Sequence, residues 1–195
     1  MYNVISTKIT RKLLKHNLID EKKQNIYSYG FEVLVSYFSY LAIAIIIAFA
    51  TKTFIPSMIF VFSFSILRKY AGGAHANSYK LCHMLFSINH VAFVLFIKNF
   101  PVKYINVFTI CILSLMLLVV WLLAPIDHEH RRFNKAEQRF FKHTSRMYML
   151  LISLLLYIIS KETACTEFVL SYLFGSFSAT ISLIFGWVKN RKRLV

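Results

Sequence analysis

The sequence is poor in the residues that cover a soluble protein or cross-link a small one. Only 8 of its 195 residues are Asp or Glu, and charged residues make up 16% of the chain, against about 25% in soluble domains. The three cysteines, Cys82, Cys111 and Cys165, are too few and too scattered for a disulfide framework or a zinc site. With only five Gly and three Pro, a collagen-like chain is also excluded.

Apolar residues dominate instead. They make up 57% of the chain, with 19 Phe and 11 Tyr, and the mean hydropathy is +0.58. This composition excludes a disordered chain and a soluble domain, and it predicts an integral membrane protein. The first 29 residues contain neither a long apolar run nor a small-residue cleavage site, so we expect no secretory signal peptide.

Six apolar segments predict an all-α membrane protein with about six transmembrane or partly re-entrant helices. The segments are Phe31–Ala50, Phe54–Leu67, Met84–Ile97, Tyr104–Ala124, Met147–Ser160 and Phe168–Val188. The second, third and fifth have only about 14 residues, a length that suits re-entrant or interfacial helices, although snorkelling side chains and bilayer thinning also let such segments span. We expect three parts, which are an N-terminal segment 1–29, a single integral membrane domain 30–188 and a basic tail 189–195.

The N-terminal segment carries six Lys or Arg residues among apolar residues that recur near helical spacing, at Ile5, Ile9 and Leu13. We therefore predict a basic amphipathic helix that lies on an anionic membrane face, with membrane lipid as its partner. A solvated basic arm is the alternative.

The distribution of charge predicts the topology. With six spans and both termini on one side, that side holds 19 of the 23 Lys and Arg, in residues 1–30, 68–83, 125–146 and 189–195. Such an excess is typical of cytoplasmic loops, so we predict a multi-pass protein of the cell membrane with both termini cytoplasmic. Topology then accounts for the excess, and no nucleic-acid partner is expected. The same cationic face would attract an acidic peptide or an anionic lipid.

The connection after the second apolar segment holds the residues most suited to chemistry. It reads Arg68-Lys69-Tyr70-Ala71-Gly72-Gly73-Ala74-His75-Ala76 and reaches Cys82 seven residues after His75. The two glycines permit turns with positive φ. A cysteine nucleophile needs a base near its sulfur, so His75 and Cys82 form a candidate dyad at the cytoplasmic membrane edge. A cysteine buried for structural reasons is the alternative.

The spacing of this pair limits its geometry. On one straight helix, positions seven apart are separated by roughly 10.5 Å along the axis, which is too far for proton transfer. We therefore predict a break between them, with Asn77 or Ser78 as the N-cap of a helix that carries Cys82 about one turn in. The helix dipole would help to stabilise the thiolate. An oxyanion donor is also required, and backbone N–H groups near Cys82 are the candidates.

The motif of Arg68, Gly73, His75 and Cys82 at these spacings resembles the signature of the accessory gene regulator B family, membrane cysteine endopeptidases of Gram-positive quorum-sensing systems. The resemblance extends over nearly the whole chain, through its size, its basic N-terminal helix, its six apolar segments and the Ala124-Pro125 turn. It implies that Cys82 is the nucleophile, that His75 is its base, and that Arg68 and Gly73 support them.

The resemblance also implies a substrate. Such enzymes cut a small autoinducer propeptide that has an amphipathic leader and an acidic C-terminal tail. A side chain of the peptide then attacks the acyl-enzyme and closes a thiolactone or lactone ring, which serves as a signal in quorum sensing and virulence regulation. A homodimer is implied as well, and we expect neither a cofactor nor a metal.

A third catalytic group cannot be assigned from the sequence alone. Glu32 is a candidate because it is the only acid within an apolar segment, but it lies close enough to the boundary to be solvated instead. Asn77 could orient the imidazole or cap the helix. The run Asp127–His130 contains metal-binding residue types, but consecutive positions rarely converge on one ion, and we predict no metal site there.

The remaining histidines and cysteines are interpreted as structural. We expect His83 to be a helix-boundary residue, His90 to be a packed or helix-bridging polar residue, Cys111 to be inert core and Cys165 to be more exposed. The competing functions are a small transporter or peptide exporter and a non-catalytic scaffold. The absence of an internal repeat and the scarcity of intramembrane charges disfavour transport.

Overall fold

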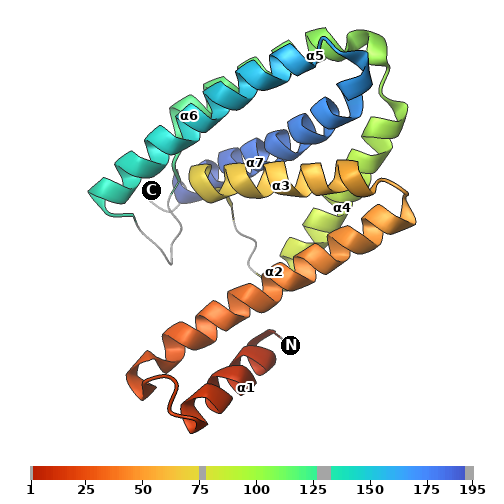
Figure 1. Ribbon diagram of the computed structural model, residues 1–195. Coiled ribbons are helices and arrows are strands. Elements are labelled where there is room, and N and C mark those ends of the chain that lie inside the picture. The colour runs from red at the N-terminus through yellow and green to blue at the C-terminus, as the bar shows by residue number, and fades with distance from the viewer. Residues whose placement is uncertain (1, 75–77, 127–132, 192–195) are drawn as a thin grey trace. The chain divides into compact units, whose positions relative to one another are not determined.

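The computed structural model describes residues 2–74, 78–126 and 133–191, and every regular element in these ranges is a helix (Figure 1). The helices are α1 (Tyr2–Lys15), α2 (Gln24–Ala50), α3 (Phe54–Ala71), α4 (Tyr79–Asn99), α5 (Ile105–Leu123), α6 (Lys135–Ile159) and α7 (Thr166–Arg191). Short 3₁₀ turns precede three of them, at Glu21–Lys23, Val102–Tyr104 and Thr163–Cys165. The prediction of an all-α protein is confirmed.

The chain divides into two compact units, Met1–Ile46 and Ile47–Val195. The first unit holds α1 and most of α2, and the second holds α3 to α7. The three parts predicted from the sequence, residues 1–29, 30–188 and 189–195, stay a prediction.

Among the described residues, five helical stretches are long and apolar enough to cross a membrane. They are Glu21–Ala50, Phe54–Ala71, Tyr79–Asn99, Val102–Leu123 and Thr166–Arg191. The two short segments predicted on either side of the Gly pair belong to longer helices, since α3 has 18 residues and α4 has 21. Helix α3 continues past the apolar run into polar sequence at its C-terminal end, and α4 does so at both ends. The protein is therefore a multi-pass membrane protein.

Helix α6 is long but is not among these five stretches. The predicted segment Met147–Ser160 forms its second half, while its first half carries exposed basic side chains such as Lys135, Arg139 and Lys142. A capping box fixes its start: the Asn134 side chain accepts from the Glu137 N–H at 2.7 Å, and the Glu137 side chain accepts from the Asn134 N–H at 3.0 Å. The helix thus begins in a polar sequence and becomes apolar along its length.

The predicted N-terminal helix is present as α1. Its basic residues, Lys8, Arg11, Lys12 and Lys15, are exposed, whereas Ser6 and Thr10 are fully buried. Both buried hydroxyls bond to carbonyl oxygens of the helix itself, which satisfies them without another element. The basic amphipathic character is confirmed, and its contact with anionic lipid stays a prediction.

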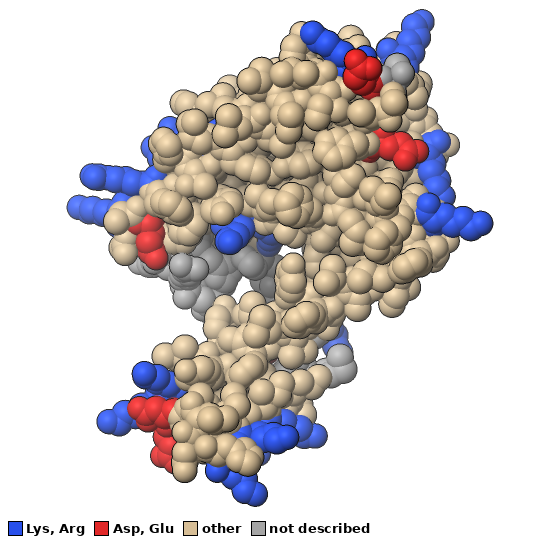
Figure 2. Space-filling view, in the orientation of Figure 1, with Lys and Arg blue, Asp and Glu red and all other residues tan. Residues whose placement is uncertain are grey.

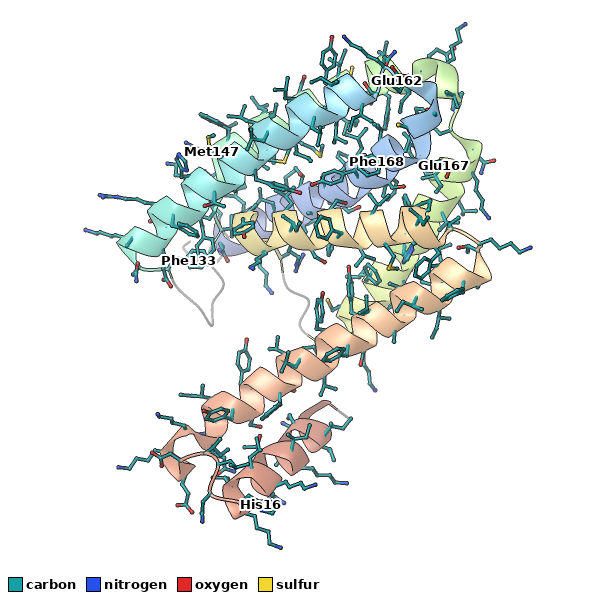
Figure 3. The ribbon with its side chains drawn as sticks, viewed as in Figure 1. His16, Phe133, Met147, Glu162, Glu167 and Phe168 are labelled. Atoms are coloured by element: carbon teal, nitrogen blue, oxygen red, sulfur yellow. The ribbon has the colours of Figure 1, made fainter. Side chains whose placement is uncertain are left out.

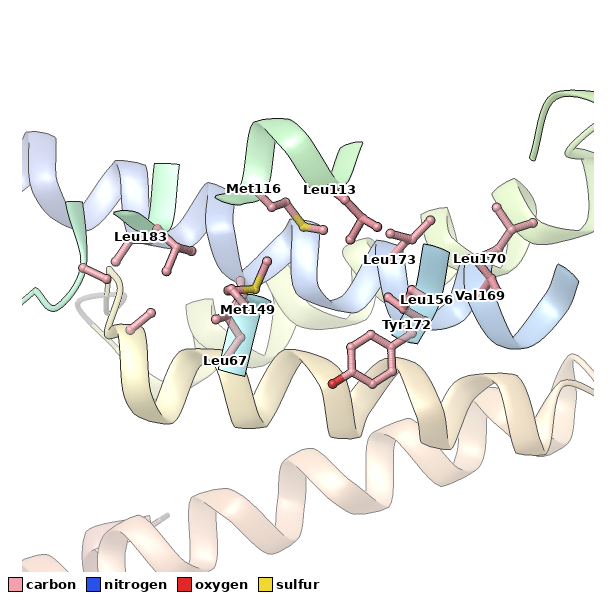
Figure 4. Close-up of a cluster of buried hydrophobic side chains, with 14 of the residues drawn as sticks. Leu67, Leu113, Met116, Met149, Leu156, Val169, Leu170, Tyr172, Leu173 and Leu183 are labelled. Carbon is pink, nitrogen blue, oxygen red and sulfur yellow. The ribbon is translucent and has the colours of Figure 1, made fainter. Parts of the chain in front are cut away.

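In the second unit, α7 packs against α3, α4 and α5. The core around it is aliphatic and includes the fully buried Leu67, Met116, Met149, Leu173 and Leu183 (Figure 4). These five come from α3, α5, α6 and α7. Small side chains on α7 allow the other helices to approach closely, as is common where membrane helices associate.

Helices α3 and α7 approach each other closely at Gly175. A Cβ atom at that position would lie 2.0 Å from Ser63 Oγ and 2.4 Å from the Phe60 carbonyl oxygen. Only a residue without a side chain fits there, so this crossing fixes α3 against α7.

Helices α3 and α4 are joined by His90. Its Nε2 lies 2.9 Å from Ser57 Oγ, and its ring packs against Phe60, which also stacks on Phe93 with 4.7 Å between ring centroids. The prediction that His90 is a packed, helix-bridging residue is confirmed.

The exposed surface of the second unit suits a lipid environment. On the face shown in Figure 2, Lys and Arg gather toward the ends of the helices and leave wide uncharged areas between them. Large apolar side chains such as Leu118, Leu122 and Leu151 are exposed. Figure 3 shows Phe133, at the start of α6, at one end of the unit and Glu162 and Glu167 at the other.

Candidate active site

The segment that follows α3 turns sharply at Gly72. The Gly72 N–H bonds to the Arg68 carbonyl oxygen at 3.0 Å, which closes the last turn of the helix. Gly72 has φ +85°, and a Cβ there would lie 2.4 Å from the Ile126 carbonyl oxygen. Side chains are strained at such a φ, so both conformation and space require glycine at this position.

The next residue, Gly73, also has a positive φ, of 151°. A Cβ there would lie 2.7 Å from Ser182 Oγ on α7. One residue before the turn, the Ala71 carbonyl oxygen accepts from the Ile126 N–H at 3.0 Å. The segment is therefore held between α7 and the residues that follow α5.

Arg68 and Ser182 fix the end of this segment. The Ala74 N–H donates to the Ser182 carbonyl oxygen at 2.8 Å. The Arg68 guanidinium donates through Nη1 to Ser182 Oγ and through Nη2 to the Ala74 carbonyl oxygen. It also lies over the Phe64 ring, 5.6 Å from its centroid. The planar fork of Arg68 thus holds two acceptors at once, and its predicted role in supporting catalysis stays a prediction.

Close packing completes this arrangement. A Cβ at Gly186 would lie 2.8 Å from both the Ala74 nitrogen and the Gly73 carbonyl carbon. The backbone of α7 therefore lies directly against residues 72–74, named the Gly72–Ala74 loop below. The last residue of this loop is the one that precedes His75 in the sequence.

His75 and Asn77 lie outside the described residues, as does the run Asp127–His130. Their predicted roles therefore stay predictions. Within residues 2–74, 78–126 and 133–191, no group of three His, Cys, Asp or Glu side chains is placed to hold a metal ion.

Cys82 lies in the first turn of α4. Ser78 is the N-cap of this helix: its hydroxyl accepts from the Leu81 N–H at 3.2 Å, and its carbonyl oxygen accepts from the Cys82 N–H at 3.1 Å. The prediction that a helix starts at residue 77 or 78 and carries Cys82 one turn in is confirmed, with Ser78 as the cap. The Cys82 side chain is exposed.

The two hydrogen bonds that Ser78 accepts also limit which N–H groups could serve as the predicted oxyanion donor. The backbone N–H groups of Leu81 and Cys82 are both directed to Ser78, so neither is oriented to an acyl group at the Cys82 sulfur. The surroundings are apolar, since Leu81, Met84 and Leu85 are exposed on the first two turns of α4. The N–H groups of Leu81 and Cys82 are thus not placed to be oxyanion donors, and a donor role for other N–H groups near Cys82 stays a prediction.

Other candidate residues are placed as follows. His83 is buried, and its Nδ1 lies 2.5 Å from the Tyr79 carbonyl oxygen of the same helix, which fits a helix-boundary role. Cys111 is exposed on α5, so its prediction as core is wrong. Cys165 is half-buried and less exposed than Cys111, so the prediction that it is the more exposed of the two is wrong. Glu32 lies half-buried on α2, in the first unit, and its catalytic role stays a prediction.

The sequence did not single out the partners of the Gly72–Ala74 loop. Ser182 is separated from Arg68 by 114 residues, and nothing in its local sequence marks it among the serines of α7. Ile126 and Gly186 are equally remote from the motif. Their roles follow from the packing of α7 and of the chain after α5 against the end of α3.

The chain is similar to known proteins over most of its length. The family described as Accessory gene regulator B matches residues 6–185. A protein of Clostridium perfringens (strain 13 / Type A) named "Putative AgrB-like protein 2" is 25% identical over 187 residues, which cover 90% of this chain and 87% of the relative. The "Putative AgrB-like protein" of Clostridium perfringens (strain SM101 / Type A) is 25% identical over 165 residues, covering 82% and 77%. No solved structure matches the chain.

Proposed function

The chain belongs to the accessory gene regulator B family, and on this premise we propose that it is a membrane-embedded cysteine endopeptidase. Its substrate is a small autoinducer propeptide of a quorum-sensing system, with an amphipathic leader and an acidic C-terminal tail. Cys82 is the nucleophile and His75 is its base. The product is a thiolactone or lactone signal peptide.

One observation carries the proposal. An exposed thiol lies in the capped first turn of α4, eight residues after a backbone residue, Ala74, that Arg68 and Ser182 hold in place. Loops on a rigid scaffold are common sites of catalytic groups. A cysteine kept only for packing would have no need of such a support immediately before the histidine of the motif.

The chemistry proceeds through a thioester. His75 takes the thiol proton, the Cys82 sulfur attacks the carbonyl carbon of the scissile bond, and the amine leaves with the proton from His75. A thiol or hydroxyl of the bound peptide then attacks the thioester, closes the ring and returns a proton to the Cys82 sulfur. Atoms and protons balance, and no external reductant or cofactor takes part.

The apolar surroundings of Cys82 support ring closure over hydrolysis. Leu81 is 39% exposed, and Met84 and Leu85 are each 53% exposed, so lipid or the peptide leader can cover the thioester. Excluding water preserves the thioester for attack by the peptide's own side chain.

The charge distribution supports the topology proposed here. Arg68 and Lys69 at the end of α3, Lys135 at the start of α6 and Lys189 and Arg191 at the end of α7 belong to the segments assigned to the cytoplasm. With both termini and the active site on that side, the cationic face attracts the acidic tail of the propeptide. A second copy of the chain completes a homodimer.

The test is cleavage of a candidate propeptide by the purified protein in liposomes, followed by intact-mass analysis of peptide and enzyme. Wild type is expected to release a cyclic peptide and to accumulate a thioester on Cys82. Cys82→Ser and His75→Ala should each lower cleavage by about 1,000-fold or more, as expected when one member of a nucleophile–base pair is removed.

Cys111→Ser is the matched control, because it removes the other exposed thiol. It should cleave at the wild-type rate. Cleavage that survives Cys82→Ser would contradict the endopeptidase mechanism. A peptide that crosses the liposome membrane uncut would favour the alternative, a small transporter or peptide exporter.

A further inference from the structure

We propose that Ser182 of α7 is a positioning residue for His75, acting through Arg68 and the backbone of Ala74. The inference rests on the proposed function, since it concerns the base of that reaction. Neither the sequence motif nor the family match assigns a role to this serine.

Ser182 meets the Gly72–Ala74 loop at two points. Its carbonyl oxygen accepts from the Ala74 N–H at 2.8 Å. Its hydroxyl accepts from Arg68 Nη1 and lies 3.4 Å from the Ala74 carbonyl oxygen, to which Arg68 Nη2 also donates. Both backbone polar groups of Ala74 are therefore tied to α7, directly or through Arg68.

The position of Ala74 in the chain makes this contact relevant to catalysis. Its carbonyl group is part of the peptide bond that joins Ala74 to His75. Fixing that oxygen restrains the plane of this peptide bond, because the atoms of a peptide unit are coplanar. A base must lie within hydrogen-bonding reach of its nucleophile, so a small rotation of this bond changes how often the imidazole reaches the thiol.

Ser182 lies on a firmly packed part of α7. Leu183, adjacent to Ser182, is fully buried in the core, and Gly186 one turn later lets the loop backbone approach α7 closely. Removing the Ser182 hydroxyl would remove the acceptor to which Nη1 of the half-buried Arg68 guanidinium donates. Because one of its charge-assisted hydrogen bonds is then lost, the guanidinium would be held less firmly and would fix the Ala74 carbonyl less firmly in turn.

The first measurement is the rate at which iodoacetamide alkylates Cys82 in the liposome-reconstituted full-length protein, followed by mass spectrometry. Alkylation of Cys111 in the same molecules is the internal reference, because that thiol is also exposed. Ser182→Ala should slow alkylation of Cys82 about 10-fold, as expected for loss of one hydrogen bond to a charged group, and leave Cys111 unchanged. In cleavage assays the same variant should lower kcat by a similar factor with little change in KM.

Two sets of variants separate positioning from general packing. Ser171→Ala removes a buried hydroxyl that bonds to the Glu167 carbonyl of α7 itself, and it should behave as wild type. Ser182→Thr and Ser182→Val have nearly the same shape, but only the first keeps a hydroxyl. Thr should restore alkylation and cleavage to within a few-fold, whereas Val should match Ala, and this pair remains informative if Ser182→Ala fails to fold.

The decisive comparison is made in a His75→Ala background. If Ser182 acts through His75, adding Ser182→Ala there should slow alkylation of Cys82 no further. An equal slowing in both backgrounds, or no slowing in either, would overturn the inference while leaving the proposed function intact. If His75→Ala itself alkylates like wild type, the proposed dyad fails first, and the inference fails with it.

Discussion

The two halves of the candidate site are held in different ways. The Gly72–Ala74 loop contacts the chain after α5 through Ile126 and contacts α7 through Ser182 and Gly186. Cys82 is held by the local N-cap of its own helix, through hydrogen bonds that reach back only to Ser78. The segment leading to the proposed base therefore depends on tertiary packing, while the turn carrying the proposed nucleophile depends on local sequence.

This difference predicts how the site fails. A change in the loop perturbs contacts with several elements that cannot all adjust, because packed interiors have little free volume. A change in the cap affects one helix end, which retains the rest of α4 and its contacts. Substitutions in the loop should therefore cost more activity than substitutions in the first turn of α4, at equal chemical severity.

Among these variants, Gly72→Ala in the Gly72–Ala74 loop should cause the largest loss of activity. The new Cβ combines a positive φ with a 2.4 Å approach to the Ile126 carbonyl oxygen. We expect cleavage of the propeptide to fall about 100-fold, since backbone strain and the clash together exceed one ordinary interaction.

Gly30→Ala is the control for that change, because no atom lies within 4 Å of a Cβ at Gly30. Its cleavage rate should equal that of wild type. A Gly72→Ala enzyme with wild-type activity would show that the loop geometry is dispensable.

Arg68→Lys should have the next largest effect. Lys keeps the charge but has a single ammonium group, which cannot reproduce the planar fork that holds Ser182 and Ala74. We expect kcat to fall about 30-fold, consistent with one lost charge-assisted hydrogen bond. Steady-state kinetics in liposomes would measure it.

Arg139→Lys, at an exposed position on α6, is the matched control and should retain wild-type kcat. Equal losses in the two variants would mean that net charge, rather than the fork geometry, is what Arg68 contributes.

Ser78→Ala should have the smallest effect. It tests the local support of the turn that carries Cys82. It removes the hydroxyl that accepts from the Leu81 N–H. Loss of an N-cap costs about 1 kcal/mol of helix stability, which corresponds to a loss of activity of about 5-fold. Amide hydrogen exchange at Leu81 and Cys82 should accelerate in parallel.

Ser78→Asn, which provides another favourable cap, should recover most of that activity. If Ser78→Ala instead loses as much activity as Gly72→Ala, the distinction between local and tertiary support is wrong.

Much of the fold could be predicted from the sequence because its signals are local. Apolar runs and basic blocks indicate spans and loops, and Ser78 marks the start of α4 within one residue. Segment lengths were less accurate, since α3 and α4 extend past the apolar residues into polar ends. The burial of Cys111 was wrong because hydropathy cannot distinguish a helix face that meets another helix from one that meets lipid.

Local sequence signals are sufficient to predict the helices, the membrane character and the motif that contains Arg68, His75 and Cys82. These depend on hydrophobicity, helix capping and residue spacing, which act over a few neighbouring positions. The support that Ser182 and Gly186 of α7 give to the Gly72–Ala74 loop depends instead on tertiary packing. A hydrogen bond between residues 114 positions apart depends on how the helices pack, and no local pattern encodes which of several serines on one helix will face the loop.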